Sequence, residues 1–329
     1  MDINSLFEEF CNYKIVVVGD VMVDAYLEGK VTRISPEAPV PIVNLAAKEE
    51  RLGGAANVAL NLLSLGASVA ICSVVGTDNY GAQMLDLMGN KSIDVSGVIS
   101  SPTRKTTVKT RIIGNNQQLL RLDSEQTDDL STSEVTALID AVEAQLKNGC
   151  DALIFEDYNK GVLTEDVITQ LIQLAKKYKV ITTVDPKHKN FFAYQGVTLF
   201  KPNLKELSEG VGRAVDVTNQ ANFEGAVDEL QEKLAAQILF ITLSEHGVFI
   251  GDEKQKEYVP AHVRTIADVS GAGDTVISVA TLCLIAGLSI KATAQLANLA
   301  GGLVCEKVGV VAIDSERFRA EALKLMASC

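Results

Sequence analysis

A glycine-rich turn near the C-terminus carries the residues best suited to chemistry. The segment DVSGAGD at 268–274 runs directly into the apolar stretch TVISVATLCLIAG. Small residues at a helix start, here Gly271-Ala272-Gly273, present free backbone N–H groups to an anion such as a phosphate, and the helix dipole favours negative charge there. Asp274 in the first helical turn could take a proton from a hydroxyl group as a phosphoryl group arrives. An ordinary glycine turn beside a helix start is the alternative explanation.

Other phosphate-binding motifs are absent from the sequence. No segment matches GxxxxGK[ST], which excludes a P-loop, and GAGDTV lacks the third glycine of the dinucleotide fingerprint. The first apolar run is followed by GDVMVD, which is not a dinucleotide fingerprint either. The sequence therefore disfavours hydride transfer.

Phosphoryl transfer also needs positive charge beside the triphosphate. Asn203 and Glu206 are three residues apart and could act on Mg²⁺ through water, because Mg²⁺ keeps much of its hydration shell. The same pair fits a helix cap with a glutamate at the third helical position. Lys187 could supply charge to the nucleotide or simply lie in solvent.

Asp24 and the segment Gly53-Gly54-Ala-Ala-Asn57 are candidates for binding the acceptor of the phosphoryl group. Asp and Asn side chains can hold sugar hydroxyls by hydrogen bonds, and glycines allow close backbone approach. A turn followed by a helix cap would explain the same residues without a ligand. Residues 104–121 contain five basic residues and no acid. This stretch could bind a phosphate on the acceptor or form a solvated face.

Charge and cysteine usage exclude several other classes of function. The net charge of −12 disfavours nucleic acid and anionic membranes as partners. Six cysteines without a CxxC pair, and only three histidines, are typical of free thiols in a reducing cytoplasm and disfavour a zinc site.

The N-terminal segment MDINSLFEEF lacks the basic region of a signal peptide. Residues 275–290 are short for a membrane span, which favours a buried helix. We expect a cytoplasmic protein.

The spacing of apolar residues predicts the elements that position these side chains. Short β-branched runs predict strands at 14–20, 68–76, 151–157, 179–185, 198–203 and 237–243. Helical patterns lie near 54–65, 79–89, 133–147, 164–178, 220–235, 274–287, 291–307 and 315–327. This alternation predicts an α/β fold with a mostly parallel sheet covered on both faces.

Polar residues follow several predicted strands and predict a site along one edge of the sheet, where ligands collect in such folds. These endings are Gly19-Asp20, Glu156-Asp157, Asp185-Pro186-Lys187, Pro202-Asn203 and Thr242. Two segments, at about 22–48 and 101–123, resemble short half-exposed strands and predict a small β lid, although ordinary surface excursions would also fit. We expect one domain over 1–329, and a homodimer formed through the unpaired edges of the lid.

Together these segments resemble the ribokinase-like, or PfkB, carbohydrate kinases over nearly the whole chain. GAGD at 271–274 is similar to the family's anion hole and catalytic aspartate, NLKE at 203–206 to its NxxE magnesium motif, and LGGAANVA at 52–59 to its glycine signature. The resemblance implies a three-layer sandwich with a β lid, and ATP and Mg²⁺ as cofactors. It implies sugar contacts by Asp24, Gly53, Gly54 and Asn57, and nucleotide contacts by Lys187, Asn203, Thr242, Ser244, Gly247 and Asn298. It also implies a monovalent-cation loop, which would take K⁺, near Asp268 and Ser270.

A narrower resemblance is to the D-glycero-β-D-manno-heptose-7-phosphate kinases of lipopolysaccharide-precursor synthesis. It is carried by GDVMVDAYLEGKVTRISPEAPVPIV at 19–43, NNQQLLRLD at 115–123 and EDYNKGVL at 156–163. This resemblance implies phosphorylation of the C1 hydroxyl and adds residues to the substrate side, namely Arg121, Asp123, Asp157 and Lys160. Two alternatives stay open: a kinase for another sugar or sugar phosphate, and a non-catalytic ligand sensor on the same fold.

Overall fold

A nine-stranded sheet runs through the body of the protein. The computed structural model describes residues 2–262 and 264–327, and within them the strand order is β13-β12-β11-β10-β9-β8-β1-β4-β5. The strands from β11 to β5 pair in parallel, and β12 and β13 add an antiparallel hairpin at one edge. The bounds are β1 (Lys14–Gly19), β4 (Ser68–Gly76), β5 (Asp94–Ser101), β8 (Ala152–Glu156), β9 (Ile181–Asp185), β10 (Leu199–Phe200), β11 (Ile238–Thr242), β12 (Val248–Gly251) and β13 (Lys256–Val259).

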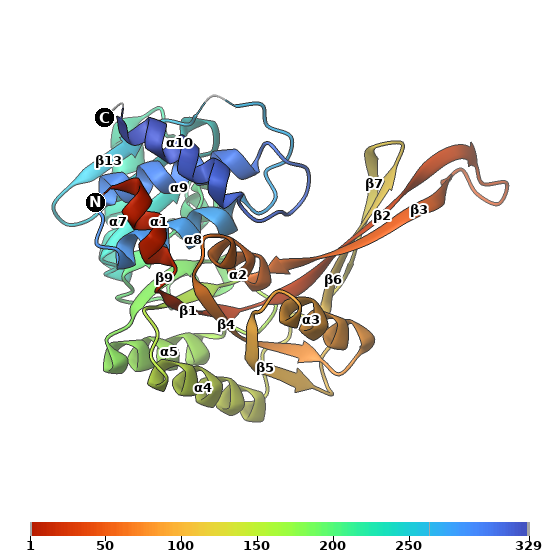
Figure 1. Cartoon of the computed structure of the whole chain (residues 1–329), viewed down its shortest axis with the longest axis horizontal. Coiled ribbons are helices and arrows are strands. Elements are labelled where there is room, and N and C mark those ends of the chain that lie inside the picture. Colours follow the sequence, from red (N-terminus) through yellow and green to blue (C-terminus); the bar gives the residue numbers. More distant parts are fainter. Residues whose placement is uncertain (1, 263, 328–329) are drawn as a thin grey trace.

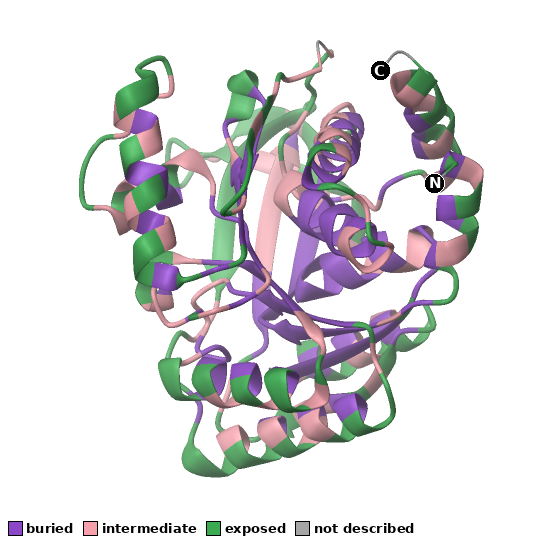
Figure 2. Cartoon of the chain, turned by 90° about the vertical axis from the view of Figure 1, so that its left-hand side faces the viewer, coloured by how far each residue is buried: buried purple, intermediate pink, exposed green. Residues whose placement is uncertain are grey.

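Helices cover both faces of this sheet and enclose two separate cores. Alternate side chains of a strand point to opposite faces, so Ile15 and Val17 enter one core while Val16 and Val18 enter the other. Figure 2 shows buried residues in the sheet and on the helix faces turned toward it. The first face carries α1 (Ile3–Phe10), α2 (Ala55–Ser64), α3 (Asn79–Gly89), α8 (Ala272–Ile285), α9 (Ile290–Val304) and α10 (Ser315–Ala327). The second carries α4 (Thr132–Lys147), α5 (Glu165–Tyr178), α6 (Leu204–Gly210) and α7 (Gln220–Leu234).

A second, four-stranded sheet projects from the body as a lid (Figure 1). Its order is β3-β2-β6-β7, with bounds β2 (Val21–Ile34), β3 (Pro41–Gly54), β6 (Thr107–Gly114) and β7 (Gln117–Ser124). The pair β2–β6 is parallel, and the outer pairs are antiparallel. Because β2 begins just after β1 and β3 ends where α2 begins, the lid is rooted at the edge of the central sheet.

Parallel pairing brings the polar strand endings together, as the sequence predicts. Gly19 is in register with Glu156, and Glu156 with Asp185, so the ends of β1, β8 and β9 lie side by side. Asn203 forms a parallel bridge with Thr242 further along the same edge. The residues that follow these strands therefore surround one region of the molecule.

The predicted α/β architecture with a mostly parallel sheet is confirmed, and the structure adds elements that the sequence patterns did not indicate: α1, β5 and the β12–β13 hairpin. The apolar segment after Asp274 is a buried helix, as predicted. Cysteines in the described part of the chain are free thiols, with Cys72 and Cys283 buried and Cys11 exposed, whereas Cys329 lies outside the described residues. None of the helices within 2–262 and 264–327 combines the length and apolarity needed to cross a membrane.

Candidate active site

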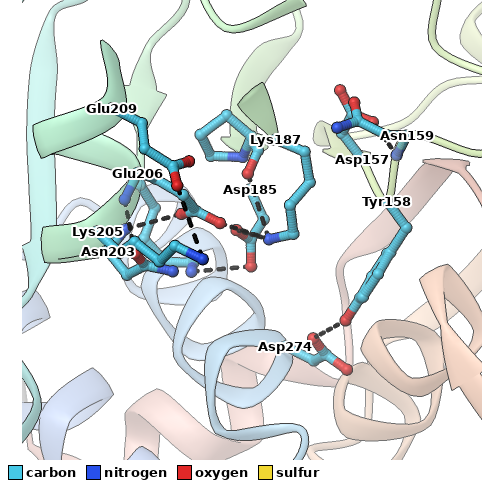
Figure 3. A network of polar contacts seen from close by, with 12 residues as sticks. Asp157, Tyr158, Asn159, Asp185, Lys187, Asn203, Lys205, Glu206, Glu209 and Asp274 are labelled. Carbon is cyan, nitrogen blue, oxygen red and sulfur yellow. Dashed lines mark hydrogen bonds and ion pairs between the residues drawn. The ribbon is translucent and has the colours of Figure 1, made fainter. Parts of the chain in front are cut away.

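The carboxylate of Asp274 is held by donors from two distant segments. Asp274 lies in the first turn of α8 and is only 4% exposed. Its Oδ2 accepts a hydrogen bond from Nδ2 of Asn57 on α2 at 2.7 Å. Its Oδ1 accepts one from the Tyr158 hydroxyl at 3.0 Å (Figure 3). Tyr158 belongs to the loop that follows β8. Two segments distant in sequence therefore fix the carboxylate carried by α8.

The turn before α8 starts the helix with a glycine in the left-handed region. Gly271 precedes the helix with φ of 78°, a conformation that favours glycine. A Cβ at this position would also lie 2.8 Å from Nδ2 of Asn57, so glycine lets Asn57 reach the aspartate. The amide of Ala272 donates to the carbonyl of Val269 at 3.3 Å. The amides of Gly273 and Asp274 follow in the first turn, where helical N–H groups lack intrahelical acceptors.

Two more buried carboxylates lie beside Asp274. Oxygens of Glu156, Asp185 and Asp274 lie within 4.8 Å of one another, and neither oxygen of Glu156 has a hydrogen-bond partner. Burial, followed by the charges of Asp185 and Asp274, raises the pKa of Glu156 well above its usual value. Burial also raises the pKa of Asp274, although the hydrogen bonds from Asn57 and Tyr158 oppose that shift. The buried ammonium of Lys201 lies 2.8 Å from Asp185 and partly offsets the negative charge.

Asn203 and Glu206 form the helix cap that the sequence allowed as an alternative to a metal site. Oδ1 of Asn203 accepts from the amide of Glu206, and Oε2 of Glu206 accepts from the amide of Asn203, both at 2.9 Å. Oε1 of Glu206 accepts from Nζ of Lys187 at 2.7 Å. Burial lowers the pKa of Lys187, but the charges of Asp185 and Glu206 raise it overall. Each carboxylate oxygen of Glu206 keeps a second lone pair, so Asn203 and Glu206 can still hold Mg²⁺ through bridging water. They are less suited to coordinate the ion directly, because their oxygens already accept hydrogen bonds.

The residues expected to contact a nucleotide lie on several different elements. Thr242 ends β11, Ser244 begins a short 3₁₀ turn with φ of 53°, and Gly247 follows that turn with φ of 87°. Asn298 on α9 donates from Nδ2 to the carbonyl of Pro260 at 2.9 Å. Their contacts with a nucleotide stay predictions.

Asp268 links the segment before α8 to the loop after α9. Its Oδ1 accepts from the amide of Ser270, and its Oδ2 accepts from the amide of Gly309, both at 2.9 Å. Burial would raise the pKa of Asp268, but these hydrogen bonds lower it overall. The predicted role of Asp268 and Ser270 toward K⁺ is not tested by these contacts.

The predicted acceptor residues lie where the lid joins the body. Asp24 on β2 is buried and forms an ion pair with Arg111 on β6. A Cβ at Gly53 would lie 2.1 Å from Oδ2 of Asp24, so the absence of a side chain there makes room for the aspartate. Gly54 leads into α2, where Asn57 has a buried Oδ1 without a hydrogen-bond partner. That oxygen can accept a hydrogen bond from an acceptor hydroxyl.

One face of the lid carries a row of basic side chains. The register pairs Asp24 with Lys109 and Lys109 with Asp123, while Arg111 pairs with Arg121. Opposed residues and residues two apart share a face, so these side chains line the same side of the sheet. Burial, followed by the positive charge of Lys160, lowers the pKa of Lys109. Lys160 pairs with Glu125 at 2.9 Å, and Arg121 pairs with Asp123 at 2.9 Å.

Comparison with known proteins settles the family. Residues 12–317 match the profile of the pfkB family carbohydrate kinases. The chain belongs to that family. Membership makes it a sugar kinase, and a kinase of this fold uses ATP and a divalent metal ion.

Relatives of this carbohydrate kinase are similar over nearly all of the chain. The "Bifunctional protein HldE" of Desulfatibacillum aliphaticivorans is 40% identical over 313 residues, and that of Helicobacter pylori strain J99 is 40% identical over 296. The matches cover 95% and 90% of this chain but only 63% of each relative. Phosphofructokinase-2 from Escherichia coli, solved with potassium, superposes with a TM-score of 0.78 at 20% identity, covering 95% of this chain and 99% of that one. Ribokinase from Arabidopsis thaliana, solved with ribose and ATP, gives 0.72 at 16% identity, with 95% and 99% covered.

Asp157 and Tyr158 of this carbohydrate kinase are neighbours in sequence, but their side chains have different partners. The substrate-side role that the resemblance implies for Asp157 stays a prediction, and its carboxylate is turned away from Asp274 (Figure 3). It accepts from the Tyr194 hydroxyl at 2.9 Å and from the amide of Asn159 at 2.8 Å, within the body. Tyr158, which the sequence analysis did not single out, contacts Asp274 instead. The sequence signals for Tyr158 were its place directly after a polar strand ending and its presence in the EDYNKGVL string at 156–163.

Proposed function

We propose that this kinase transfers the γ-phosphoryl group of ATP to the C1 hydroxyl of D-glycero-β-D-manno-heptose 7-phosphate. The product would be the 1,7-bisphosphate, a precursor of ADP-heptose for the lipopolysaccharide core. One observation carries the reaction type: the Asp274 carboxylate is fixed at the start of α8, beside first-turn amides and a glycine turn. The RISPEAPVP string at 33–41 and the similarity to HldE proteins support the acceptor. The use of ATP favours the cytoplasm as the place of reaction.

The proposed chemistry needs one proton transfer and one displacement. Asp274 accepts the proton of O1 as O1 bonds to the γ-phosphorus and the bond from that phosphorus to the bridging oxygen of ADP breaks. Amides of the 271–274 turn donate to the phosphoryl oxygens, where the helix dipole also favours negative charge. Asp24 and Asn57 accept hydrogen bonds from sugar hydroxyls. A bound Mg²⁺, held through water near Asn203 and Glu206, would neutralise phosphate charge.

The basic face of the lid supports a phosphorylated acceptor over a neutral sugar. Lys109 and Lys160 repel each other, and Arg111 and Arg121 lie on the same side of the lid. A phosphate dianion placed among these groups would form charge-assisted hydrogen bonds and relieve the repulsion. We therefore assign the 7-phosphate to this face, with O1 reaching Asp274.

A comparison of acceptors tests the proposal. The purified protein with ATP and Mg²⁺ should release ADP with heptose 7-phosphate at a kcat/KM at least about 100-fold above those with fructose 6-phosphate and ribose, because unpaired polar groups penalise the wrong sugar. Phosphorus NMR of the product should show a new phosphate on C1. Faster turnover of another sugar would make the chain a kinase for that sugar. ATP binding without turnover of any of these acceptors would favour a ligand sensor.

We also propose that a second copy of the chain covers the other face of the lid. Leu120 and Leu122 alternate with Arg121 and Asp123, so they point away from the basic face, and they are 57% and 59% exposed. Opposite them in the register lie Ile112 and Thr110, which extend the apolar surface over β6. The lid projects from the body (Figure 1), which leaves this face accessible to a second molecule.

Light scattering at micromolar concentration checks the dimer. The wild-type protein should have twice the mass of the chain, and Leu120→Lys together with Leu122→Lys should give the monomer with an unchanged circular dichroism spectrum. The exposed pair Lys30→Glu and Lys105→Glu is the matched control and should stay dimeric. A monomeric wild-type protein would refute the proposal.

A further inference from the structure

Tyr158 occupies an unusual position, because its hydroxyl donates to the base of the proposed reaction. The bond to Oδ1 of Asp274 is 3.0 Å long, and the phenol ring lies 5.3 Å from Nζ of Lys187 (Figure 3). Burial, followed by the nearby charges of Asp274 and Glu156, raises the pKa of Tyr158 well above its usual value. The phenol therefore keeps its proton and can act only as a donor to the carboxylate.

The loop that carries Tyr158 is anchored by the buried carboxylate of Asp20. Oδ2 of Asp20 accepts from the amides of Tyr158 and Lys160, at 2.9 and 3.0 Å, and Oδ1 accepts from that of Val162 at 3.3 Å. Asp20 is only 2% exposed, so these bonds are shielded from water. A Cβ at Gly161, where φ is 90°, would lie 2.0 Å from the carbonyl of Asp128. The loop is thus fixed at several points, and the hydroxyl of Tyr158 is held in place.

Asp274 needs such a donor because of the charges around it. Glu156 from β8 and Asp185 from β9 face it within 4.8 Å, and the ammonium of Lys201, which follows β10, is paired with Asp185. Asn57 from α2 secures only Oδ2. Without a donor at Oδ1, repulsion from the other carboxylates would favour rotation or protonation of the base.

We propose that Tyr158 is a positioning residue, whose hydroxyl holds the Asp274 carboxylate ionised and in one orientation toward the acceptor hydroxyl. The inference rests on the proposed function, since it concerns the base of that reaction. It predicts a defect in the rate of transfer and in its pH dependence, with little change in substrate binding, because Tyr158 acts through Asp274.

The test compares Tyr158→Phe with Tyr194→Phe. Both changes remove one phenolic hydroxyl that donates to a buried carboxylate, but Tyr194 donates to Asp157, which is turned away from the base. In Tyr158→Phe we expect kcat to fall about tenfold, a part of the 10²–10⁴ that a general base contributes, with KM for both substrates within about twofold. The acidic limb of kcat against pH should move to higher pH, because the lost bond favoured the charged form. Tyr194→Phe should leave kcat and the limb unchanged.

Three outcomes are decisive when Asp274→Asn is assayed in parallel. Wild-type kcat and an unmoved limb in Tyr158→Phe would overturn the inference and leave the proposed function intact, provided that Asp274→Asn is inactive. Equal defects in the two phenylalanine variants would also overturn it, since packing alone would then explain them. Full activity of Asp274→Asn would instead overturn the role of Asp274 as the base in the proposed function. Circular dichroism and thermal unfolding confirm that each variant is folded.

Discussion

The surroundings of Asp274 and those of the lid differ in almost every physical respect, although both contribute to one site. Asp274 is 4% exposed, and each of its oxygens has a fixed donor. Every residue of β7 is exposed, and the basic side chains of the lid are partly open to solvent. In a buried site, loss of one hydrogen bond leaves a polar group without a partner, which costs free energy. In an exposed site, water replaces the lost partner. We therefore expect the first region to control the rate and the second to control affinity and assembly.

Removal of the base should give the largest loss of activity among these changes. A small loss would contradict the view that the buried region controls the rate. Asp274→Asn keeps the size of the side chain and loses its ability to take a proton. We expect kcat to fall by about 10²–10⁴, with KM for the acceptor little changed. Steady-state kinetics with a coupled ADP assay measures both constants. Near-normal turnover would show that another group accepts the proton.

The buried region should also respond to pH through Asp157. Burial, followed by the charge of Asp20, raises the pKa of Asp157 to about 7. The folded state then binds the proton more tightly than the unfolded state, so this group makes the protein less stable as pH rises from about 4 to about 7. Asp157→Asn mimics the protonated form and removes this dependence.

Between pH 5 and pH 8 we therefore expect wild type to lose about 2–3 kcal/mol of unfolding free energy relative to Asp157→Asn. Urea unfolding at the two pH values measures the difference, and the other titrating groups cancel between the two proteins. Parallel curves for the two proteins would show that Asp157 is ionised at pH 5 in the folded state.

A change on the basic face of the lid should weaken binding of the acceptor and leave kcat intact, in contrast to a change at Asp274. Lys109→Met removes one ammonium group from the basic face and keeps an apolar stem. Loss of one charge-assisted hydrogen bond should raise KM for heptose 7-phosphate about 10–100-fold, with kcat within about twofold. Lys30→Met, on an exposed part of the same lid, should leave both constants unchanged. A fall in kcat for Lys109→Met at wild-type KM would place Lys109 at the reacting phosphate.

Much of the fold could be predicted from local patterns. The apolar runs at 68–76 and 79–89 became β4 and α3 with the same bounds, because each has a clear periodicity and its own turn residues. Elements with weak patterns were missed. β5 reads DVSGVISS and is only partly buried, and the eight residues of α1 lie in a terminal segment without a strong start signal. The β12–β13 hairpin likewise joins two strands of four residues each.

The site was predicted less completely than the fold. The turn at 271–274 and Asn57 could be found, since their residue types imply a helix start and a ligand. Lys201, which directly follows β10, was not singled out, and its ammonium is 2.8 Å from Asp185. Asp20 was noted only as a strand ending, but its carboxylate anchors the loop that carries Tyr158. Sequence spacing does not say which strand lies next to which, so these partners could not be assigned.

The sequence by itself determined the parallel α/β architecture, the glycine turn before α8 and the presence of a carboxylate in its first turn, because these depend on local periodicity and on backbone sterics. The tertiary structure alone decided that Tyr158 contacts that carboxylate while Asp157 bonds to Tyr194, and that Glu206 caps a helix and pairs with Lys187. Neighbouring residues after a strand point in different directions, and the packing of the surrounding elements determines which of them reaches the site.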